Sequence, residues 1–364
     1  MKKSYLMIAA AAALFAACSS NDTFKEVVEE TAIGFQPYAS NATKAAITGS
    51  DNAARLASLA SAGGFKVYGY KTIETSNLWT QSGSISTIFN GTTVTSSNSG
   101  ADWSYTGLRF WDKTATYNFY AVAPASPTHG TYAIIAPPTA NYGRITITGA
   151  TSAEKDDADD FLIDRTGATG ELGSSHTAAS NPTVDFDFHH IMAKVEFALK
   201  STLASGTITV SELTMKGWNS GTATFTQDLS ITGAPSQLVY GEWQFTSNGS
   251  GDVTLVGTNA GNASVELTCS ASASATALSD WYIMVPQAIQ ANTLEFTVTY
   301  TFDDGNGYTE TFTDQPAKLT AAQTWGTDSH TTYTLDIKPA QIIFDVTSVC
   351  GFDVNGGDQP VTVE

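Results

Sequence analysis

The chain has 364 residues and a formal net charge of −18, and only 14% of its residues are charged. A surface this acidic repels phosphate backbones, which excludes nucleic acid as a partner. Hydrophobic residues make up 42% of the chain and aromatic residues 11%, enough to bury a large core, so a disordered chain is also excluded. The length favours two domains over one.

The first 17 residues predict a secretory signal peptide. Met1–Lys3 is basic, Leu6–Ala17 is apolar, and two alanines precede the expected cut. The apolar run is too short to span a membrane, which needs about 20 residues. Cys18 follows the small residues and resembles the cysteine of a bacterial lipobox, which receives a diacylglycerol and further acyl chains such as palmitate. A plain signal peptide that happens to contain Cys18 is the alternative. Residues 18–30 are predicted to form an acidic tether.

The first strand is predicted at about residues 31–40. Ile33, Phe35 and Pro37 fall on one face, and the proline favours an edge position. Alternating aromatic and β-branched residues predict further strands at 65–70 and 117–122, and a short helix is expected over 52–62. Residues 31–181 are therefore assigned to an N-terminal β-sandwich.

A second series of strands is expected over residues 182–340. It includes the strands 189–197, 207–210, 281–285, 294–302 and 331–337, and residues 303–307 predict a hairpin turn. The fold class is therefore all-β, with two β-sandwich domains in tandem.

A separate strand is expected in the last segment, residues 341–364. Ile342, Phe344 and Val346 share one face, and Val349 joins them past a bulge. After a turn at residues 355–358, Val361 and Val363 alternate again, so an apolar strand pair is expected at the C-terminus.

No catalytic, cofactor or metal site is predicted. His189 and His190 are adjacent in a strand and face opposite ways, so we expect structural roles for both. A solvated acidic loop is expected at four aspartates that lack calcium-loop spacing, Asp156, Asp157, Asp159 and Asp160. The sequence contains no G-x-S-x-G, CxxC or HExxH motif, which argues against an enzyme. The seven tryptophans could stack on sugars, although core packing is the more general role.

Two cysteines remain if Cys18 is lipidated. Cys269 and Cys350 could form a disulfide outside the cytoplasm or stay as two buried thiols, and sequence alone leaves both open.

Several strings resemble segments of the fimbrillins, the lipoprotein pilins of Bacteroidales. Phe188–Phe197 (FHHIMAKVEF) is similar to their F-x-H-x-M-A-K-V-x-F segment, and Asp160–Ile163 resembles their D-L-L strand. Val285–Gln287 with Leu294–Val298 is similar to their P-Q turn and following strand, and Trp325 with Thr332–Leu335 resembles their ending. The order and spacing of these strings carry the resemblance, which runs from Cys18 to the C-terminus.

This resemblance implies two transthyretin-like β-sandwiches that assemble into type V pili. A precursor lipidated at Cys18 would reach the outer membrane, and a trypsin-like protease would remove the first strand. The implied cut lies at Lys44–Ala45, with Arg55–Leu56 as second choice. Other pilin subunits would be the partners, and mature protein would lie in cell-surface fimbriae that support adhesion.

Elementary physics makes it feasible for a strand of a neighbouring subunit to replace the strand that is removed. Removing an edge strand leaves unpaired backbone groups and an apolar groove, which is a template for another strand. The implied donor is the segment 341–364, whose Ile342, Phe344, Val346 and Val349 would each gain about 1.5–3 kcal/mol on burial. Because the contact is head-to-tail, it produces a filament. The alternatives are a tip adhesin or glycan-binding surface lipoprotein, or an uncleaved anchor subunit, on the same scaffold.

Overall fold

The computed structural model describes residues 31–38, 52–72, 85–112, 114–135, 144–154, 159–164, 174–177, 183–228, 241–339 and 341–351. This part of the chain is built almost wholly of strands, with one helix, α1 (Asn52–Ser61), where the sequence predicts it. The all-β fold class is therefore confirmed. No helix within these ranges is long and apolar enough to cross a membrane.

Two sheets form the half of the molecule that contains the N-terminal strand. The larger is seven-stranded, in the order β1 (Gly34–Tyr38), β10 (Thr183–His190), β8 (Leu162–Asp164), β4 (Thr116–Ala123), β2 (Phe65–Thr72) and β3 (Ile85–Val94), with β9 (Ser174–Thr177) also paired to β4. The second is four-stranded, in the order β14 (Glu242–Phe245), β13 (Ala223–Asp228), β6 (Arg144–Ala150) and β5 (Thr131–Ile135).

The other half also contains two larger sheets. One has the order β23 (Gln341–Gly351), β22 (Ser329–Lys338), β11 (Ala193–Lys200), β17 (Thr276–Met284) and β7 (Ala153–Glu154). Its partner has the order β15 (Ser250–Val256), β12 (Thr207–Asn219), β19 (Glu295–Asp303) and β20 (Thr309–Lys318), with β16 (Val265–Thr268) also paired to β12. A small ribbon joins β18 (Gln287–Ile289) to β21 (Gln323–Trp325).

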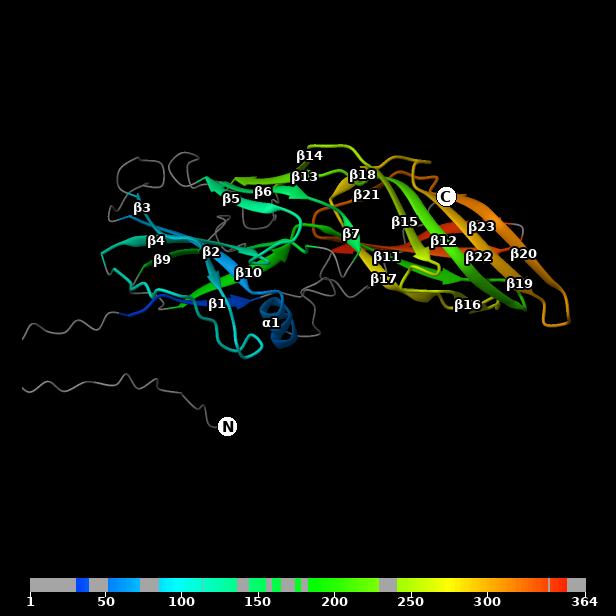
Figure 1. The fold of residues 1–364 in the computed structure, drawn as a ribbon, viewed down its shortest axis with the longest axis horizontal. Coiled ribbons are helices and arrows are strands. Elements are labelled where there is room, and N and C mark those ends of the chain that lie inside the picture. Colours follow the sequence, from blue (N-terminus) through cyan, green and yellow to red (C-terminus); the bar gives the residue numbers. More distant parts are fainter. Residues whose placement is uncertain are drawn as a thin grey trace, which may run out of the picture.

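The two halves lie end to end along the long axis of the molecule (Figure 1). Strand pairing crosses the expected domain boundary at residue 181 in both directions. β10 and β13 follow that boundary but pair with strands that precede it, and β14 extends the same sheet by pairing with β13, whereas β7 precedes the boundary and pairs with β17. The division into residues 31–181 and 182–340 therefore stays a prediction about folding units.

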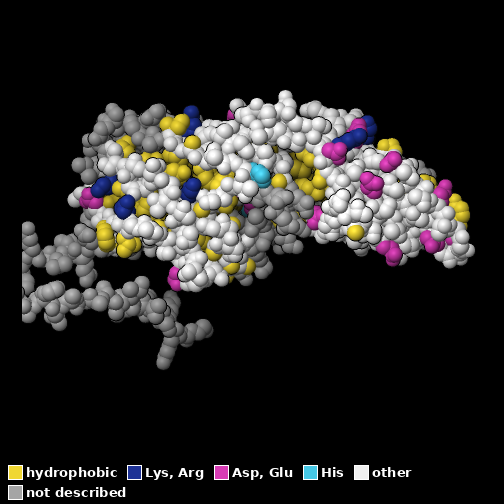
Figure 2. Space-filling model, viewed as in Figure 1, with side chains coloured by type: hydrophobic (Ala, Val, Ile, Leu, Met, Phe, Trp, Pro, Cys, Tyr) yellow, Lys and Arg dark blue, Asp and Glu magenta, His cyan; other side chains and the backbone are white. Residues whose placement is uncertain are grey.

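The seven-stranded sheet curls on itself around an aromatic core. β1 and β3 are its opposite ends, yet the rings of Phe35 and Phe89 have centroids 5.1 Å apart. Leu59 of α1 and Trp111 are buried in the same cluster. The other face of the sheet packs against β6 and β13, where Ile147 and Phe225 are fully buried. In Figure 2, apolar side chains gather over this half of the molecule.

The second half is a sandwich with a single large core. Its two sheets contribute alternate residues, among them Val195, Phe197, Tyr300 and Tyr333, all almost inaccessible to solvent. The predicted hairpin at residues 303–307 joins β19 to β20. Gly305 and Gly307 take φ values of 75° and 98° there, which only glycine adopts without strain.

Candidate functional site

The first strand, β1, lies at the edge of its sheet, as its proline predicts. It runs parallel to β10, from Gly34 opposite Thr183 to Tyr38 opposite Asp187. The residues just before it pair with a second segment: the Ile33 amide donates to the Arg109 carbonyl at 2.8 Å. The chain from residue 31 to 38 is thus tied to β10 along one stretch and to residues 109–111 along another.

The side chains of β1 enter an aromatic enclosure, which we call the β1 seat. Ile33 and Phe35 are 1% and 4% exposed, and Pro37 is also buried, so their predicted common face is confirmed. Four rings surround Phe35 at centroid distances of 5.1, 5.4, 5.6 and 5.8 Å, those of Phe89, Tyr105, Phe186 and Phe119. The Tyr105 hydroxyl also donates to the Ile33 carbonyl at 2.8 Å. These four rings define the seat.

The rim of the β1 seat carries exposed apolar side chains. Leu108 is 60% exposed and Phe110 is 44% exposed, and both belong to the segment that flanks residues 31–33. Large hydrophobic residues on a monomer surface are ordinary when single, but two beside an edge strand are typical of a contact surface.

Predicted processing residues fall in two different places. Cys18, Lys44 and Ala45 lie outside the described residues. Arg55 and Leu56 belong to α1 and are only 7% and 6% exposed. A protease needs an accessible, extended segment, so this burial argues against Arg55–Leu56 as the cleavage site.

The expected donor strand is paired with its own chain. β23 runs antiparallel to β22, and the register places the backbone of Ile342, Phe344, Val346 and Val349 beside that of Ile337, Leu335, Tyr333 and Thr331, all four of them buried. The register shifts between Thr332 and Tyr333, which is the irregularity that the sequence predicts before Val349. The Ile342 side chain packs on the core of the second sandwich.

The remaining candidate residues have structural partners. His190 is buried and its Nδ1 lies 2.8 Å from Asp160 Oδ1, whereas the His189 Nε2 lies 3.2 Å from Asp187 Oδ2. Structural roles for the two histidines fit these contacts. Cys269 is a buried free thiol, and its Sγ lies 3.5 Å from the Ser201 Oγ.

The expectation of a solvated acidic loop is wrong for its two described aspartates. Asp159 is 7% exposed and accepts hydrogen bonds from the backbone of Thr128 and His129, and Asp160 is 1% exposed. Both can be buried because their carboxylates have hydrogen-bonding partners, the Thr128 and His129 amides for Asp159 and the His190 ring for Asp160. Asp156 and Asp157 lie outside the described residues. Within the described ranges, no group of three or more acidic, histidine or cysteine side chains could hold a metal ion.

One buried charge cluster has no counterpart in the sequence predictions. Lys194, near the start of β11, is 1% exposed and forms an ion pair with Glu196, and its Nζ lies 5.2 Å from the centroid of the Trp281 ring. His330 of β22 reaches the other carboxylate oxygen of Glu196 at 3.0 Å. Burial by itself would raise the pKa of Glu196, but the hydrogen bonds from His330 and Lys194 outweigh it and lower the pKa to about 2. In the sequence, the only sign of this buried cluster is a lysine among apolar strand residues.

The fold and the β1 seat define an all-β sandwich protein that holds an edge strand in an aromatic enclosure. A family model described as fimbrillin-like matches residues 33–350. The chain belongs to the fimbrillin-like family. Membership supports a subunit of cell-surface fimbriae whose partners are other pilin subunits. No curated protein sequence matches the chain significantly.

Solved structures resemble this chain at low sequence identity. A fimbrial protein from Bacteroides vulgatus ATCC 8482 is 21% identical, with a TM-score of 0.62, and the match covers 88% of this chain and 99% of that one. A putative cell adhesion protein from Bacteroides uniformis ATCC 8492 is 13% identical with a TM-score of 0.44, covering 89% and 98%. The tip fimbrial protein Mfa3 from Porphyromonas gingivalis is 10% identical with a TM-score of 0.30, covering 79% and 94%. The first of these supports the fold.

Proposed function

We propose that the chain is a structural subunit of a type V pilus, made as an outer-membrane lipoprotein precursor and activated by proteolysis. A lipid on Cys18 holds the precursor, and a trypsin-like protease cuts at Lys44–Ala45. The observation that carries this proposal is the seating of β1: an edge strand whose Phe35 and Pro37 are buried, together with Ile33 just before it. Its removal would uncover the rings of the β1 seat and the backbone of β10. The role is structural, not enzymatic.

The C-terminal segment has the pattern needed to refill the seat. Ile33-x-Phe35-x-Pro37, at the start of β1 and just before it, has the same spacing as Ile342-x-Phe344-x-Val346 in β23. A donor that enters in the direction of β1 would therefore place Phe344 among the four rings that now enclose Phe35. Ladder hydrogen bonds to β10 fix the register, and the neighbour's segment makes the contact head-to-tail.

A second candidate function is favoured by the position of β23. Because β23 is paired with β22 of its own chain, the donor has to leave that pairing before it can reach a neighbour. A tip adhesin, or an uncleaved anchor subunit that keeps its lipid, needs no such release. N-terminal sequencing of surface material separates the anchor, which would begin at modified Cys18, from a stalk subunit, which would begin at Ala45.

Limited trypsin treatment of the unprocessed protein tests the stalk proposal. We expect cleavage after Lys44 followed by a ladder of oligomers on size-exclusion chromatography. Lys44→Ala should prevent both events, and Arg55→Gln, within the buried turn of α1, should prevent neither. Cleavage at Lys44 that yields only monomers would contradict strand exchange.

A peptide of residues 341–349 gives an independent test of the donor. Added in excess to freshly cleaved protein, it should occupy the β1 seat and stop the ladder at monomer. The same peptide carrying Phe344→Ala loses the ring that fills the seat, and it should block at least about tenfold less well, since burying an aromatic side chain contributes about 1.5–3 kcal/mol. Equal blocking by both peptides would exclude the proposed register.

A further inference from the structure

Large hydrophobic side chains are exposed at four positions among the described residues. They are Leu108, Phe110 and Ile135 in the first half of the molecule and Tyr308 in the second, with exposed fractions of 60%, 44%, 38% and 53%. Single exposed side chains of this kind are ordinary, whereas a group of them marks a contact surface. The strand directions place all four at the two outer ends of the molecule, where the halves face away from each other.

The outer end of the first half, which we call the first pole, comprises residues 31–33, residues 108–110 and Ile135. β10 leads through two residues into β11 of the second half, so β10 and the parallel β1 both run inward and begin at the outer end (Figure 1). Ala32, just before β1, bridges to Phe110. β6 also runs inward, since β7 follows it, and its first residue, Arg144, pairs with Ile135.

The outer end of the second half, which we call the second pole, comprises residues 200–207, the hairpin 303–308 and residues 338–341. β11 runs outward and β22 is parallel to it, so β22 ends there at Lys338 and β23 begins there at Gln341. β12 begins soon after β11 ends, and its first residue, Thr207, pairs with Asp303. Figure 1 shows the turn between β19 and β20 at the far end of this half. The proposed donor therefore starts at the same end as the hairpin that carries Tyr308.

A donor in the place of β1 would bring a neighbour's second pole against the first pole. With Phe344 at the position of Phe35, Gln341 takes the place of Ala32, which is the residue beside Phe110. Only two residues separate Lys338 from Gln341, and these three steps along the chain span at most about 11 Å. The end of the neighbour's β22 is thus held within that distance of residues 109–111.

The hairpin is long enough to reach across this gap. The Tyr300 hydroxyl donates to the Lys338 carbonyl at 2.9 Å, which fixes β19 beside the end of β22. β19 continues outward from Tyr300 to Asp303, a further distance of about 10 Å, before the chain turns. β20, the returning strand of the hairpin, is in contact with β23. The hairpin therefore projects past Lys338 on the side from which the donor leaves.

The first pole and the hairpin carry opposite charges. Arg109 lies between Leu108 and Phe110 and is exposed. Residues 303–310 contain three carboxylates and no lysine or arginine, and the Glu310 carboxylate accepts a hydrogen bond from the Tyr308 hydroxyl at 2.6 Å. In the view of Figure 2, several Lys and Arg side chains lie over the first half, and Asp and Glu side chains gather over the outer part of the second. This complementarity favours a head-to-tail contact between copies.

We propose that in the fibre the hairpin 303–308 of one copy of this chain docks on the first pole of the next copy. Tyr308 packs against Leu108 and Phe110, and Glu310 faces Arg109. The contact rests on the proposed strand exchange, which sets its direction and spacing. Because it needs no movement of β23, it holds the neighbour in place while the donor leaves β22 and enters the β1 seat.

Charge reversal across the contact tests the proposal. Full-length protein is cut with a lysine-specific endoprotease, which leaves an introduced arginine intact, and the rate of oligomer formation is followed by size-exclusion chromatography. Arg109→Glu and Glu310→Arg each place like charges face to face, and each should slow oligomer formation about tenfold. The double variant restores an opposite pair and should assemble within about threefold of the wild-type rate. Asp303 and Asp304 stay unchanged because their carboxylates accept hydrogen bonds from turn amides.

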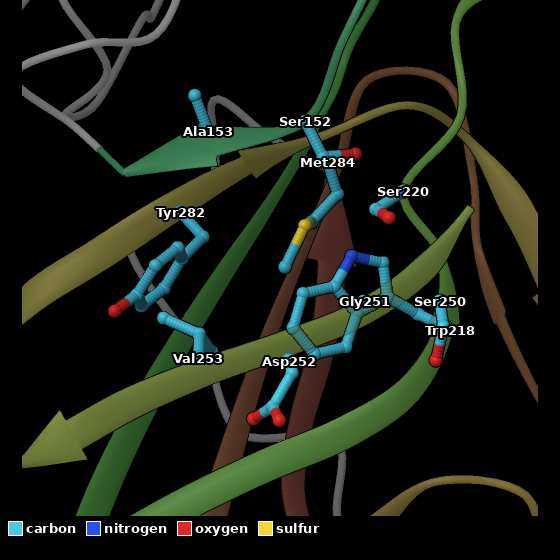
Figure 3. A pocket seen from close by; sticks show the side chains of 10 residues that line it. All are labelled: Ser152, Ala153, Trp218, Ser220, Ser250, Gly251, Asp252, Val253, Tyr282 and Met284. Carbon is cyan, nitrogen blue, oxygen red and sulfur yellow. The ribbon is translucent and has the colours of Figure 1, made fainter.

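The matched control reverses a carboxylate that lies away from both poles. Asp252 is exposed on β15 and pairs with Lys216 near the inner end of β12. It borders a cavity of about 250 Å³, and Figure 3 shows its carboxylate turned away from the Trp218 indole. Arg109→Glu with Asp252→Arg has the same net charge as the rescuing pair and should stay about tenfold slow. The peptide of residues 341–349 should bind every variant like wild type, because none of the changes alters a ring of the β1 seat.

Two results would overturn the contact between the poles and leave strand exchange standing. One is wild-type protein that forms oligomers while both single reversals keep pace with it. The other is rescue of Arg109→Glu by Asp252→Arg as complete as that by Glu310→Arg. Wild-type protein that forms no oligomers after cleavage at Lys44 would overturn strand exchange itself, and the contact with it.

Discussion

Phe35→Ala is expected to lower the free energy of unfolding of the unprocessed protein by about 3–5 kcal/mol, the usual cost of removing a buried aromatic ring. Phe35 is 4% exposed and contacts four other rings, so the cavity left behind cannot easily collapse. Chemical denaturation followed by tryptophan fluorescence measures the change. The loosened β1 should also leave its seat more readily, so oligomers should form faster after trypsin treatment.

Gln36→Ala is the matched control for this substitution. Gln36 is the next residue of β1, is only partly buried, and donates its side-chain amide to the neighbouring Pro37 carbonyl. Its loss should change the unfolding free energy by no more than about 0.5–1 kcal/mol. In fully processed protein both variants should match wild type, because the cut removes the residue. A Phe35→Ala defect that persists after processing would mean that β1 stays in the fold.

Residue patterns predict the strands better than their partners. The strand expected over residues 189–197 is in fact the end of β10, which runs to His190, and the start of β11, which begins at Ala193. Along β10, Val184, Phe186 and Phe188 alternate with polar residues and are all inaccessible. The same alternation cannot say that β10 pairs in parallel with β1, because a period of two fixes which side chains share a face but not the neighbouring strand. The expected boundary at residue 181 rests on a polar stretch, and strand pairing crosses it.

The candidate site, too, could be predicted from the sequence only in part. The common face of Ile33, Phe35 and Pro37 and the edge position follow from spacing and from one proline. The rest of the β1 seat cannot be predicted from spacing. Tyr105 and residues 109–111 show no strand alternation, and they lie beside residues 31–33 only because the sheet curls. Lys194 shows a different limit: its charge cluster includes Glu196, Trp281 and also His330, which is distant in sequence but lies on the neighbouring strand β22.

Glu196→Gln is expected to lower the free energy of unfolding by about 3–5 kcal/mol near pH 7, because it leaves the charge of Lys194 buried without its counterion. The pKa of Glu196 falls to about 2 in the folded protein, against about 4.5 for an ordinary glutamate. A carboxylate whose pKa is lowered by folding contributes stability above the unfolded pKa and loses it as pH falls. The difference between wild type and variant should therefore be full above pH 4.5 and shrink down to about pH 2.

Glu295→Gln is the control for this titration, since Glu295 also lies between two lysines, Lys216 and Lys318, but both of these lysines are about half exposed. Its pKa is lowered mainly by the hydrogen bond from Lys318. Water and salt screen such a pair, so its removal should change stability little and less still at high salt. Denaturation midpoints of the two variants, measured from pH 7 to pH 2, compare a buried ion pair with an exposed one in the same sandwich. Equal losses for both would mean that the ion pair of the buried Lys194 contributes no more to stability than an exposed pair does, which contradicts the prediction.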